Sequence, residues 1–434
     1  MAVHSARPDG HLGDRVPHHR VVVTGLGAIT PIGHDIESFW SAACRGVSGT
    51  RRLVGIEEDR LEARVAAQVV DFDTDAVLRK KDRRHLPRAA PLGIAAASQA
   101  LESAGLLENG AYAGPPEDAS VVIGSGGGGL SFAVEQLGLY YRDQVKKASV
   151  YVIPAATPGT LSSEISTAFG MHGMSHVLSN GCTSSTDALG YAFRHIRHGT
   201  ADVVLSGGTD ATISHPILMG FELMKIMSTG FNEQPEAASR PFDSRRDGFV
   251  LGEGAWMLVL EELEHARRRA VPILAEVLGY GATCEAYHRV RLQDDGVEPA
   301  RAMTLALEEA GLPAEAVDYV SLHGTATRLN DVVETRAMKR ALGEHARTIP
   351  MSALKSMIGH PQGASGAAGV VAALLSMRDG FVHPTINLEQ PDPECDLDYV
   401  ARQGRRHTVD VALCNCIGFG SKNAALVLRR WRDA

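Results

Sequence analysis

Cys182 is the residue of this chain whose surroundings best suit a nucleophile. A short β-like run at residues 176–178 precedes it, and a helix-like stretch follows to about residue 198. This spacing predicts a thiol at a strand-to-helix turn, where free backbone N–H groups and the helix dipole favour an anion and lower the thiol pKa. Because the thiolate is the reactive form of cysteine, the location favours nucleophilic catalysis. Taken alone, however, a cysteine is more often a small buried apolar residue.

Two histidines and a lysine lie in turns that also follow predicted strands. His323 leaves a predicted strand at residues 317–322, and His360 lies in a glycine-rich turn shortly after Lys355. Imidazoles can donate hydrogen bonds to a carbonyl or transfer protons. Each of these residues alone is more often structural or solvated. Together with a nucleophilic cysteine they indicate acyl chemistry on thioesters.

Residues 124–129 formally match the G-x-G-x-x-G pattern after a predicted strand at residues 119–124. No acid ending a strand about 20 residues further on supports a dinucleotide site. We favour the interpretation that these glycines let the backbone pass close to the floor of the catalytic site.

Alternating strands and helices predict an α/β protein with stacked layers. The same order of elements occurs twice, and each half places its reactive residues just after strand ends, where α/β sheets form their sites. We therefore expect an internal duplication. The predicted parts are a disordered tail at residues 1–19, a half containing Cys182 at residues 20–270, and a half containing both histidines and Lys355 at residues 271–434.

Composition excludes several classes of protein. The chain has 434 residues, of which 44% are hydrophobic, so it should bury a large core. A net charge of −8 argues against a general nucleic-acid binder. The six cysteines show no disulfide spacing, which indicates a reducing cytoplasm. No apolar stretch is long enough to span a membrane, and the polar first residues do not form a signal peptide.

Several motifs in order resemble the β-ketoacyl-acyl carrier protein synthases, condensing enzymes with the thiolase fold. The resemblance covers about residues 20–429. It includes the motif around Cys182, His-Gly-Thr-x-Thr at residues 323–327, Lys-Ser-Met-x-Gly-His at 355–360, the signature within 240–254, and Gly-Phe-Gly at 418–420. The resemblance implies a duplicated five-layered α-β-α-β-α architecture.

Within this family, the residues around Cys182 are most similar to the ketosynthase alpha subunits of bacterial type II polyketide synthases. Those subunits pair with a chain-length factor, a homologue that lacks the cysteine. The near alternative is the homodimeric β-ketoacyl-acyl carrier protein synthase II that elongates fatty acids in primary metabolism. The partner is therefore expected to be either a chain-length-factor-like homologue or a second copy of this chain.

The resemblance also implies a mechanism that needs no metal or cofactor in the enzyme. Cys182 would take an acyl chain from the phosphopantetheine arm of an acyl carrier protein. The N–H groups of Cys182 and Phe419 would form an oxyanion hole, worth about 3–4 kcal/mol per donor. His323 and His360 would stabilise the enolate formed from malonyl-carrier protein by decarboxylation, and this carbanion would attack the acyl chain. Lys355 belongs to the same catalytic set.

The carrier protein of this family is acidic, so the resemblance implies a basic docking surface. The basic run comprises Arg79, Lys80, Lys81, Arg83 and Arg84. A salt-sensitive encounter there is expected. The alternative is an ordinary solvated basic face.

The chain departs from the family pattern at several positions. The family has Glu fourteen residues after the motif lysine, where this chain has Gly369. We hypothesise that Asp331 or Glu334 replaces it as the partner of Lys355. The loop after Tyr287 reads Val-Arg-Leu at residues 290–292 instead of Thr-x-Pro, and Ser421 replaces a glycine. These changes suggest a specialised substrate.

Three other functions remain as alternatives. A degradative thiolase would use a second cysteine in a Cys-x-Gly-x-Gly turn, and residues 416–420 fit that string. A non-catalytic chain-length partner is disfavoured by the intact set of Cys182, His323 and His360. An ester-forming variant would release no carbon dioxide.

Overall fold

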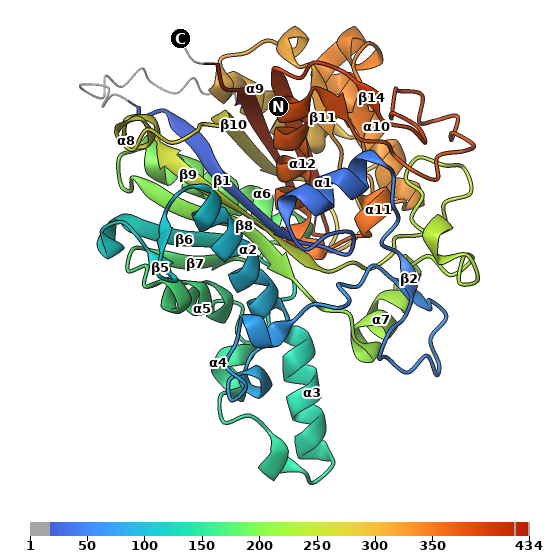
Figure 1. Ribbon diagram of the computed structural model, residues 1–434. Helices are drawn as coiled ribbons and strands as arrows, with labels where there is room; N and C mark the ends of the chain where they lie inside the picture. Colours follow the sequence, from blue (N-terminus) through green and yellow to red (C-terminus); the bar gives the residue numbers. More distant parts are fainter. Residues whose placement is uncertain (1–17, 421, 433–434) are drawn as a thin grey trace, which may run out of the picture.

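The computed structural model describes residues 18–420 and 422–432, so the predicted tail at residues 1–19 lies almost wholly outside it. Its main sheet has ten strands in the order β12-β11-β15-β16-β10-β1-β9-β8-β6-β7 (Figure 1). The strands of the first half are β1 (Val21–Ile29), β6 (Ala119–Gly124), β7 (Ser175–Leu178), β8 (Val203–Asp210) and β9 (Gly254–Glu262). Those of the second half are β10 (Ala275–Cys284), β11 (Tyr319–Ser321), β12 (Met351–Ser352), β15 (Val411–Gly418) and β16 (Lys422–Arg430).

The two halves have the same strand topology. Counted along the chain within each half, the strands lie side by side in the order third, second, fourth, fifth, first. The first strands, β1 and β10, pair antiparallel over three residues and join the halves. The identical order supports the internal duplication more directly than the sequence does.

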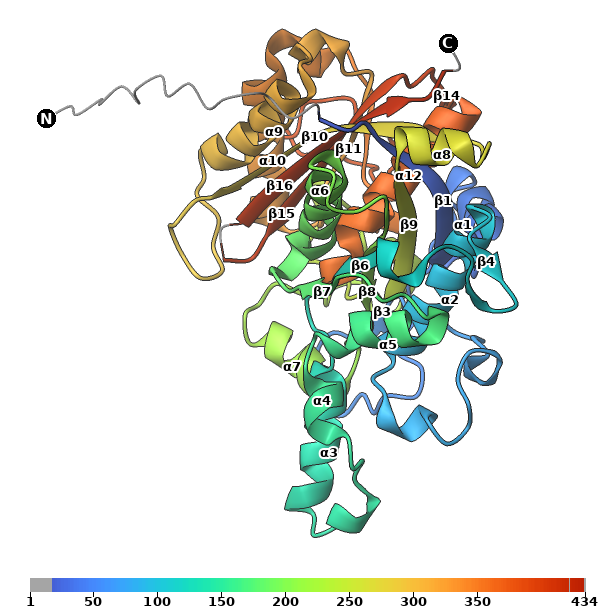
Figure 2. The ribbon, with the colours of Figure 1, turned by 90° about the vertical axis from the view of Figure 1, so that its left-hand side faces the viewer.

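Helices cover both sides of each half and fill the space between them (Figures 1 and 2). Helix α6 (Ser184–Arg197) packs on β6 and β8 of the first half and on β10 and β16 of the second, while α12 (Ser365–Asp379) packs on β11, β15, β8 and β9. Outside them, α2 (Ala89–Ser103) and α5 (Thr160–Phe169) cover the first half, and α9 (Val297–Ala310) covers β10 and β16. The layers are therefore α-β-α-β-α.

A pair of glycines on each first strand lets the outer helix approach closely. An added Cβ at any of them would overlap a carbonyl oxygen of the helix backbone. Each pair also begins at a β-bulge. The pairs are Gly25 and Gly27 against α2, and Gly279 and Gly281 against α9. Both glycines of the first pair lie inside β1, so the strand continues through them and does not end in a glycine turn.

Helices α3 (Leu130–Tyr141) and α4 (Val152–Ala156) project from the body as an arm, defined here as residues 130–156 (Figure 2). The arm exposes apolar side chains, which include Tyr141 at 79%, Val150 at 80% and Ile153 at 77%. The remaining helices are α1 (Ile36–Cys44), α7 (His215–Glu222), α8 (Leu263–Arg268), α10 (Arg328–Leu342) and α11 (Lys355–Ile358). None of the helices within the described ranges has the length and apolar character needed to cross a membrane.

Candidate active site

Cys182 lies where the sequence placed it, at the turn between β7 and α6. The turn is a short 3-10 helix, Gly181–Thr183, and Gly181 begins it with a φ of +70°, which glycine adopts without strain. The Cys182 side chain is buried in the layer between the two halves. Burial raises the pKa of its thiol, although the Phe419 N–H, the charge of Lys355 and its own N–H act in the opposite direction. The expectation of a lowered pKa was therefore wrong, because burial outweighs the helix terminus.

The structure brings Cys182, His323 and His360 together from both halves of the fold. One ligand-type atom from each lies within 4.8 Å of the others. The two imidazole rings are nearly perpendicular, with centroids 5.4 Å apart. One sulfur and two ring nitrogens could also bind zinc, so distance alone does not distinguish a metal site from an acyl-transfer site.

Lys355 determines which nitrogen of His323 carries the proton. Its ammonium donates to the His323 carbonyl oxygen at 2.7 Å and lies 3.4 Å from Nδ1. Because an ammonium is only a donor, Nδ1 must accept and Nε2 keeps its hydrogen. Burial, then the charge of Lys355 and the neighbouring imidazole of His360, hold the pKa of His323 well below its usual value. His323 is therefore a neutral donor through Nε2.

His360 has the same tautomer for a different reason. The backbone N–H of Gln362 donates to Nδ1 at 3.2 Å, and Ser365 Oγ lies 2.9 Å from the same nitrogen. Nδ1 is thus an acceptor and Nε2 carries the hydrogen. Burial and the charge of Lys355 lower the pKa of this imidazole well below the usual value. The site offers two neutral N–H donors beside one sulfur.

Neither carboxylate proposed as the partner of Lys355 forms an ion pair with it in the described part of the chain. Glu334 instead accepts the N–H groups of His323 and Gly324 at 2.6 and 2.7 Å. Asp331 accepts the Phe242 N–H at 2.8 Å. The hypothesis of a direct pair is therefore wrong. Both carboxylates raise the pKa of Lys355 from a distance, but burial dominates and lowers it.

The backbone N–H groups of Phe419 and of Cys182 itself lie close enough to the Cys182 sulfur to act on the pKa of its thiol, which both lower. These are the two donors that the sequence assigned to an oxyanion hole. They lie on opposite halves of the fold, on the turn before α6 and at the end of β15. Both N–H groups therefore lie beside the sulfur to which an acyl carbon would be attached, which is where an oxyanion would develop.

A cavity of about 520 Å³ leads to this cluster. The buried side chains of Cys182, His323 and His360 line its inner part, while Lys225, Arg291 and Arg328 are exposed around its rim. Thr325, Thr327 and Phe419 also line the cavity. A flexible thioester arm with an anionic outer end fits this arrangement of buried donors and outer cations.

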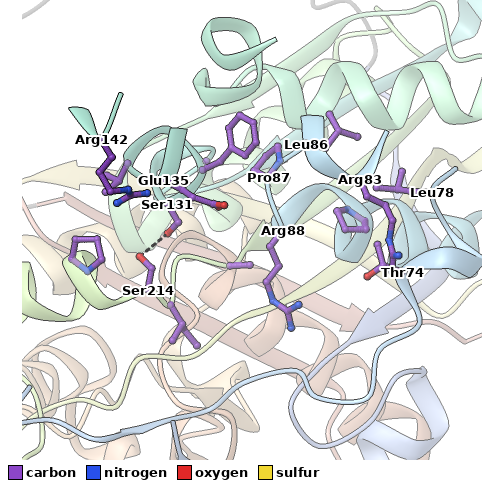
Figure 3. Close-up of a pocket in the computed structure, with 17 residues that line it drawn as sticks. Thr74, Leu78, Arg83, Leu86, Pro87, Arg88, Ser131, Glu135, Arg142 and Ser214 are labelled. Atoms are coloured by element: carbon purple, nitrogen blue, oxygen red, sulfur yellow. Dashed lines mark hydrogen bonds between the residues drawn. The ribbon is translucent and has the colours of Figure 1, made fainter. Parts of the chain in front are cut away.

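The basic run predicted as a docking surface does not line this cavity. Arg83 lines a second cavity of about 630 Å³, together with Arg88 and Arg142 (Figure 3). Arg79 lines a third, of about 710 Å³. Lys80, Lys81 and Arg84 are exposed nearby. Arg79 pairs with Asp82 and Arg83 with Asp75, so part of the run's charge is already neutralised by the chain itself.

The glycine loop after β6 holds a carboxylate of the protein. Asp210 accepts the N–H groups of Gly126, Gly127 and Gly363 at 2.6–3.0 Å, and Ser125 Oγ donates at 3.0 Å. Burial raises the pKa of Asp210 to about 6. These donors are therefore not available to a nucleotide phosphate. Sequence reasoning missed Asp210, because an acid at the end of a strand gives no sign of its partners.

The second cysteine of the thiolase-like string is in the wrong place for thiolase chemistry. Cys416 is 1% exposed and does not line the cavity that contains Cys182. A thiolase needs this thiol to reach the substrate. The thiolase alternative therefore has no support from the geometry.

Comparison with known proteins gives matches along most of the chain. Residues 18–266 match the model of the β-ketoacyl synthase N-terminal domain, and residues 274–389 match that of the C-terminal domain. The 3-oxoacyl-[acyl-carrier-protein] synthase 2 of Synechocystis sp. is 40% identical over 95% of this chain and 98% of its own. A putative polyketide beta-ketoacyl synthase 1 of Streptomyces halstedii is 41% identical over 94% and 97%.

Two solved structures share the fold. One is a type II polyketide synthase acyl-carrier protein in complex with its ketosynthase bound to the hexaketide, with 32% identity, TM-score 0.85, and coverage of 96% of this chain and 100% of that one. The other is the ishigamide ketosynthase/chain length factor, with 31% identity, TM-score 0.87 and the same coverage. These likenesses confirm the thiolase fold expected from the sequence.

Proposed function

This chain belongs to the β-ketoacyl synthase family and is a condensing acyltransferase, and we propose that it extends a polyketide carried on an acyl carrier protein. Substrates of this family are carried on phosphopantetheine, and the enzyme itself uses no further cofactor. The observation that carries the proposal is the buried Cys182 sulfur beside two neutral Nε2–H donors, at the inner end of one cavity. This is a donor set for thioester chemistry, and both imidazoles are already in the tautomer it needs.

The first half-reaction is transfer of the acyl chain to Cys182. The sulfur attacks the carbonyl of the incoming thioester, and the N–H groups of Cys182 and Phe419 stabilise the oxyanion. The carbon–sulfur bond to the carrier breaks, and the thiol proton of Cys182 ends on the departing phosphopantetheine sulfur. Burial raises the pKa of the resting thiol, so loss of its proton is unfavourable. The positive charge of Lys355 lowers this pKa and therefore assists when the proton leaves.

The second half-reaction is condensation with malonyl-carrier protein. His323 and His360 donate from Nε2 to the malonyl thioester oxygen, so that the electron pair released by loss of carbon dioxide forms a stabilised enolate. Its carbon attacks the acyl-Cys182 carbonyl, and the sulfur of Cys182 leaves. The product is a β-ketoacyl thioester, two carbons longer, on the carrier.

The polyketide assignment is supported by the motif around Cys182 and by the departures from the family pattern at Gly369 and residues 290–292. The alternative is a homodimeric fatty-acid β-ketoacyl-acyl carrier protein synthase II, and the relative in Synechocystis is an enzyme of that kind by name. Similar identities to relatives of both kinds leave the substrate to experiment.

Two features support assembly with a second subunit of the same fold. The strand β7 is at the edge of the sheet and pairs only with β6. The arm exposes several large apolar side chains. Edge strands and exposed apolar patches are surfaces that partner chains cover. We infer a partner that is either a chain-length-factor-like homologue or a second copy.

All six cysteines are free, which supports the proposed cytoplasmic location.

The test is the intact mass of the protein after incubation with an acyl-carrier protein, with and without a co-expressed homologue. Wild type should gain one acyl mass, and Cys182→Ala should gain none. Acylation only with the homologue favours the polyketide subunit, whereas acylation of the chain alone favours the homodimeric enzyme. A folded wild type that never gains mass overturns the nucleophile. Release of carbon dioxide during extension distinguishes condensation from ester formation.

A further inference from the structure

Cys416, the buried thiol on β15, contacts both ends of the catalytic cluster. Its sulfur donates to the Cys182 carbonyl oxygen at 3.1 Å and lies 3.4 Å from His323 Nδ1. Cys182 belongs to the first half of the fold and Cys416 to the second. The contact therefore joins the halves at the site itself.

The thiol of Cys416 is a hydrogen-bond donor, not a second nucleophile. Burial raises its pKa to about 12, so it keeps its proton at physiological pH. The Cys182 carbonyl takes that hydrogen. His323 Nδ1 meanwhile accepts from the stronger, charged donor Lys355. The sulfur of Cys416 then packs against the imidazole edge.

The position of Cys416 in the chain links it to the oxyanion donors. It lies three residues before Phe419, on the segment that carries the second N–H. Through its bond to the Cys182 carbonyl, it holds the peptide unit next to the first N–H. At Gly418, between them, an added Cβ would lie 3.5 Å from the Cys182 nitrogen, so the two segments are in close contact.

We propose that Cys416 is a positioning residue that fixes the separation of the two oxyanion donors, the N–H groups of Cys182 and Phe419. This inference rests on the proposed function. It assigns Cys416 a role in acyl transfer to Cys182, and none in the enolate chemistry that His323 and His360 perform. Cys416 acts through Cys182, because it does not line the cavity.

The experiment compares four variants of the full chain, each with its partner subunit if one is required. Cys416→Ala removes the donor, Cys416→Val fills the volume without a donor, and Cys416→Ser restores a donor. Cys414→Ala is the matched control, because it removes a buried thiol two residues earlier on the same strand. Two rates are measured: acylation of Cys182 by an acyl-carrier protein, and release of carbon dioxide from malonyl-carrier protein without an acyl donor. Melting temperatures report folding.

Cys416→Ala and Cys416→Val should acylate about tenfold more slowly, which is the effect of losing one modest hydrogen bond, while malonyl decarboxylation changes less than twofold. Cys416→Ser should recover most of the acylation rate, and Cys414→Ala should keep both rates. Equal slowing of both reactions, slow acylation by the serine variant, or unchanged acylation by a folded alanine or valine variant overturns the inference. A wild type that is not acylated overturns the proposed function instead.

Discussion

Lys355 shows how a single buried cation can order several groups. It donates to the carbonyl of His323 and selects the Nε2–H tautomer of that ring, and its charge adds to the burial that keeps both imidazoles neutral. The family's carboxylate partner is replaced by Gly369, where an added Cβ would lie 2.8 Å from Ser321 Oγ. The backbone carbonyl of His323 accepts a hydrogen bond from Lys355, and the backbone N–H of His323 donates one to Glu334.

Glu334 should make the stability of the protein depend on pH. Burial raises its pKa to about 7 from an ordinary value of 4.5. The folded state then binds more protons than the unfolded state between pH 4.5 and 7, so this residue's contribution to stability is largest below pH 4.5 and is lost as pH rises through 7. The change is up to about 3 kcal/mol.

We expect the unfolding free energy of wild type, compared with Glu334→Gln, to decrease between pH 5 and 7.5. Denaturant titrations of both proteins across this range measure the difference. Glutamine keeps one acceptor for the N–H groups of His323 and Gly324, so it should still fold. A difference that is constant, or that increases with pH, would contradict a carboxyl with a raised pKa.

At the scale of elements, two basic surfaces are candidates for docking the acidic carrier that we propose as a partner. The run at residues 79–84 lies beside α2, against cavities that Cys182 does not line. The rim residues Lys225, Arg291 and Arg328 come from the loops after α7 and β10 and from the start of α10. Because the thioester must enter by the rim, the rim cations lie on its path.

Charge reversal should separate the contributions of these surfaces. We expect Lys225→Glu with Arg291→Glu to raise KM for the carrier substrate about tenfold or more at low salt, with kcat little changed, because steering acts on encounter. Lys80→Glu with Lys81→Glu should raise KM as well if the run docks the carrier, as predicted from the sequence. Carrier-free acyl-pantetheine is the control substrate. If the KM for the carrier substrate is unchanged in the Lys80→Glu, Lys81→Glu variant, the carrier does not dock on the run at residues 79–84.

At the scale of the whole molecule, the duplication makes a paired prediction. Gly27 and Gly281 occupy equivalent positions on β1 and β10, and an added Cβ at each would overlap the backbone of α2 or α9. We expect Gly27→Ala and Gly281→Ala to destabilise the fold by similar amounts, about 2–4 kcal/mol each. Chemical denaturation measures this. The control is Gly220→Ala on α7, where an added Cβ meets no atom within 4 Å. Unequal losses would show that the halves are not mechanically equivalent.

Features that depend on residues close together in the chain could be predicted from the sequence. Contacts between residues far apart in the chain could not. Cys182 and His323 could be placed because strand-end turns are visible in the chain. The bonds of Glu334 and Asp210 could not be predicted, because their partners lie on other elements and only burial makes the contacts decisive. Glycine usually weakens a strand, so a sequence alone does not show that Gly25 lies within one and allows a helix to approach.

The turn before α12 is equivalent to the turn before α6, and the comparison shows how many acyl groups the two turns can carry. The short helix Gln362–Ala364 precedes α12 as Gly181–Thr183 precedes α6, and its central residue is Gly363 instead of a cysteine. An added Cβ there would overlap the Gly126 nitrogen, so no side chain could occupy that position. Of the two equivalent turns, only the one at Cys182 can therefore carry an acyl group. Two acyl groups on Cys182 per assembled pair indicate two like subunits, and one indicates a pair with a cysteine-free homologue. The number of acyl groups on Cys182 therefore shows which subunits form the pair.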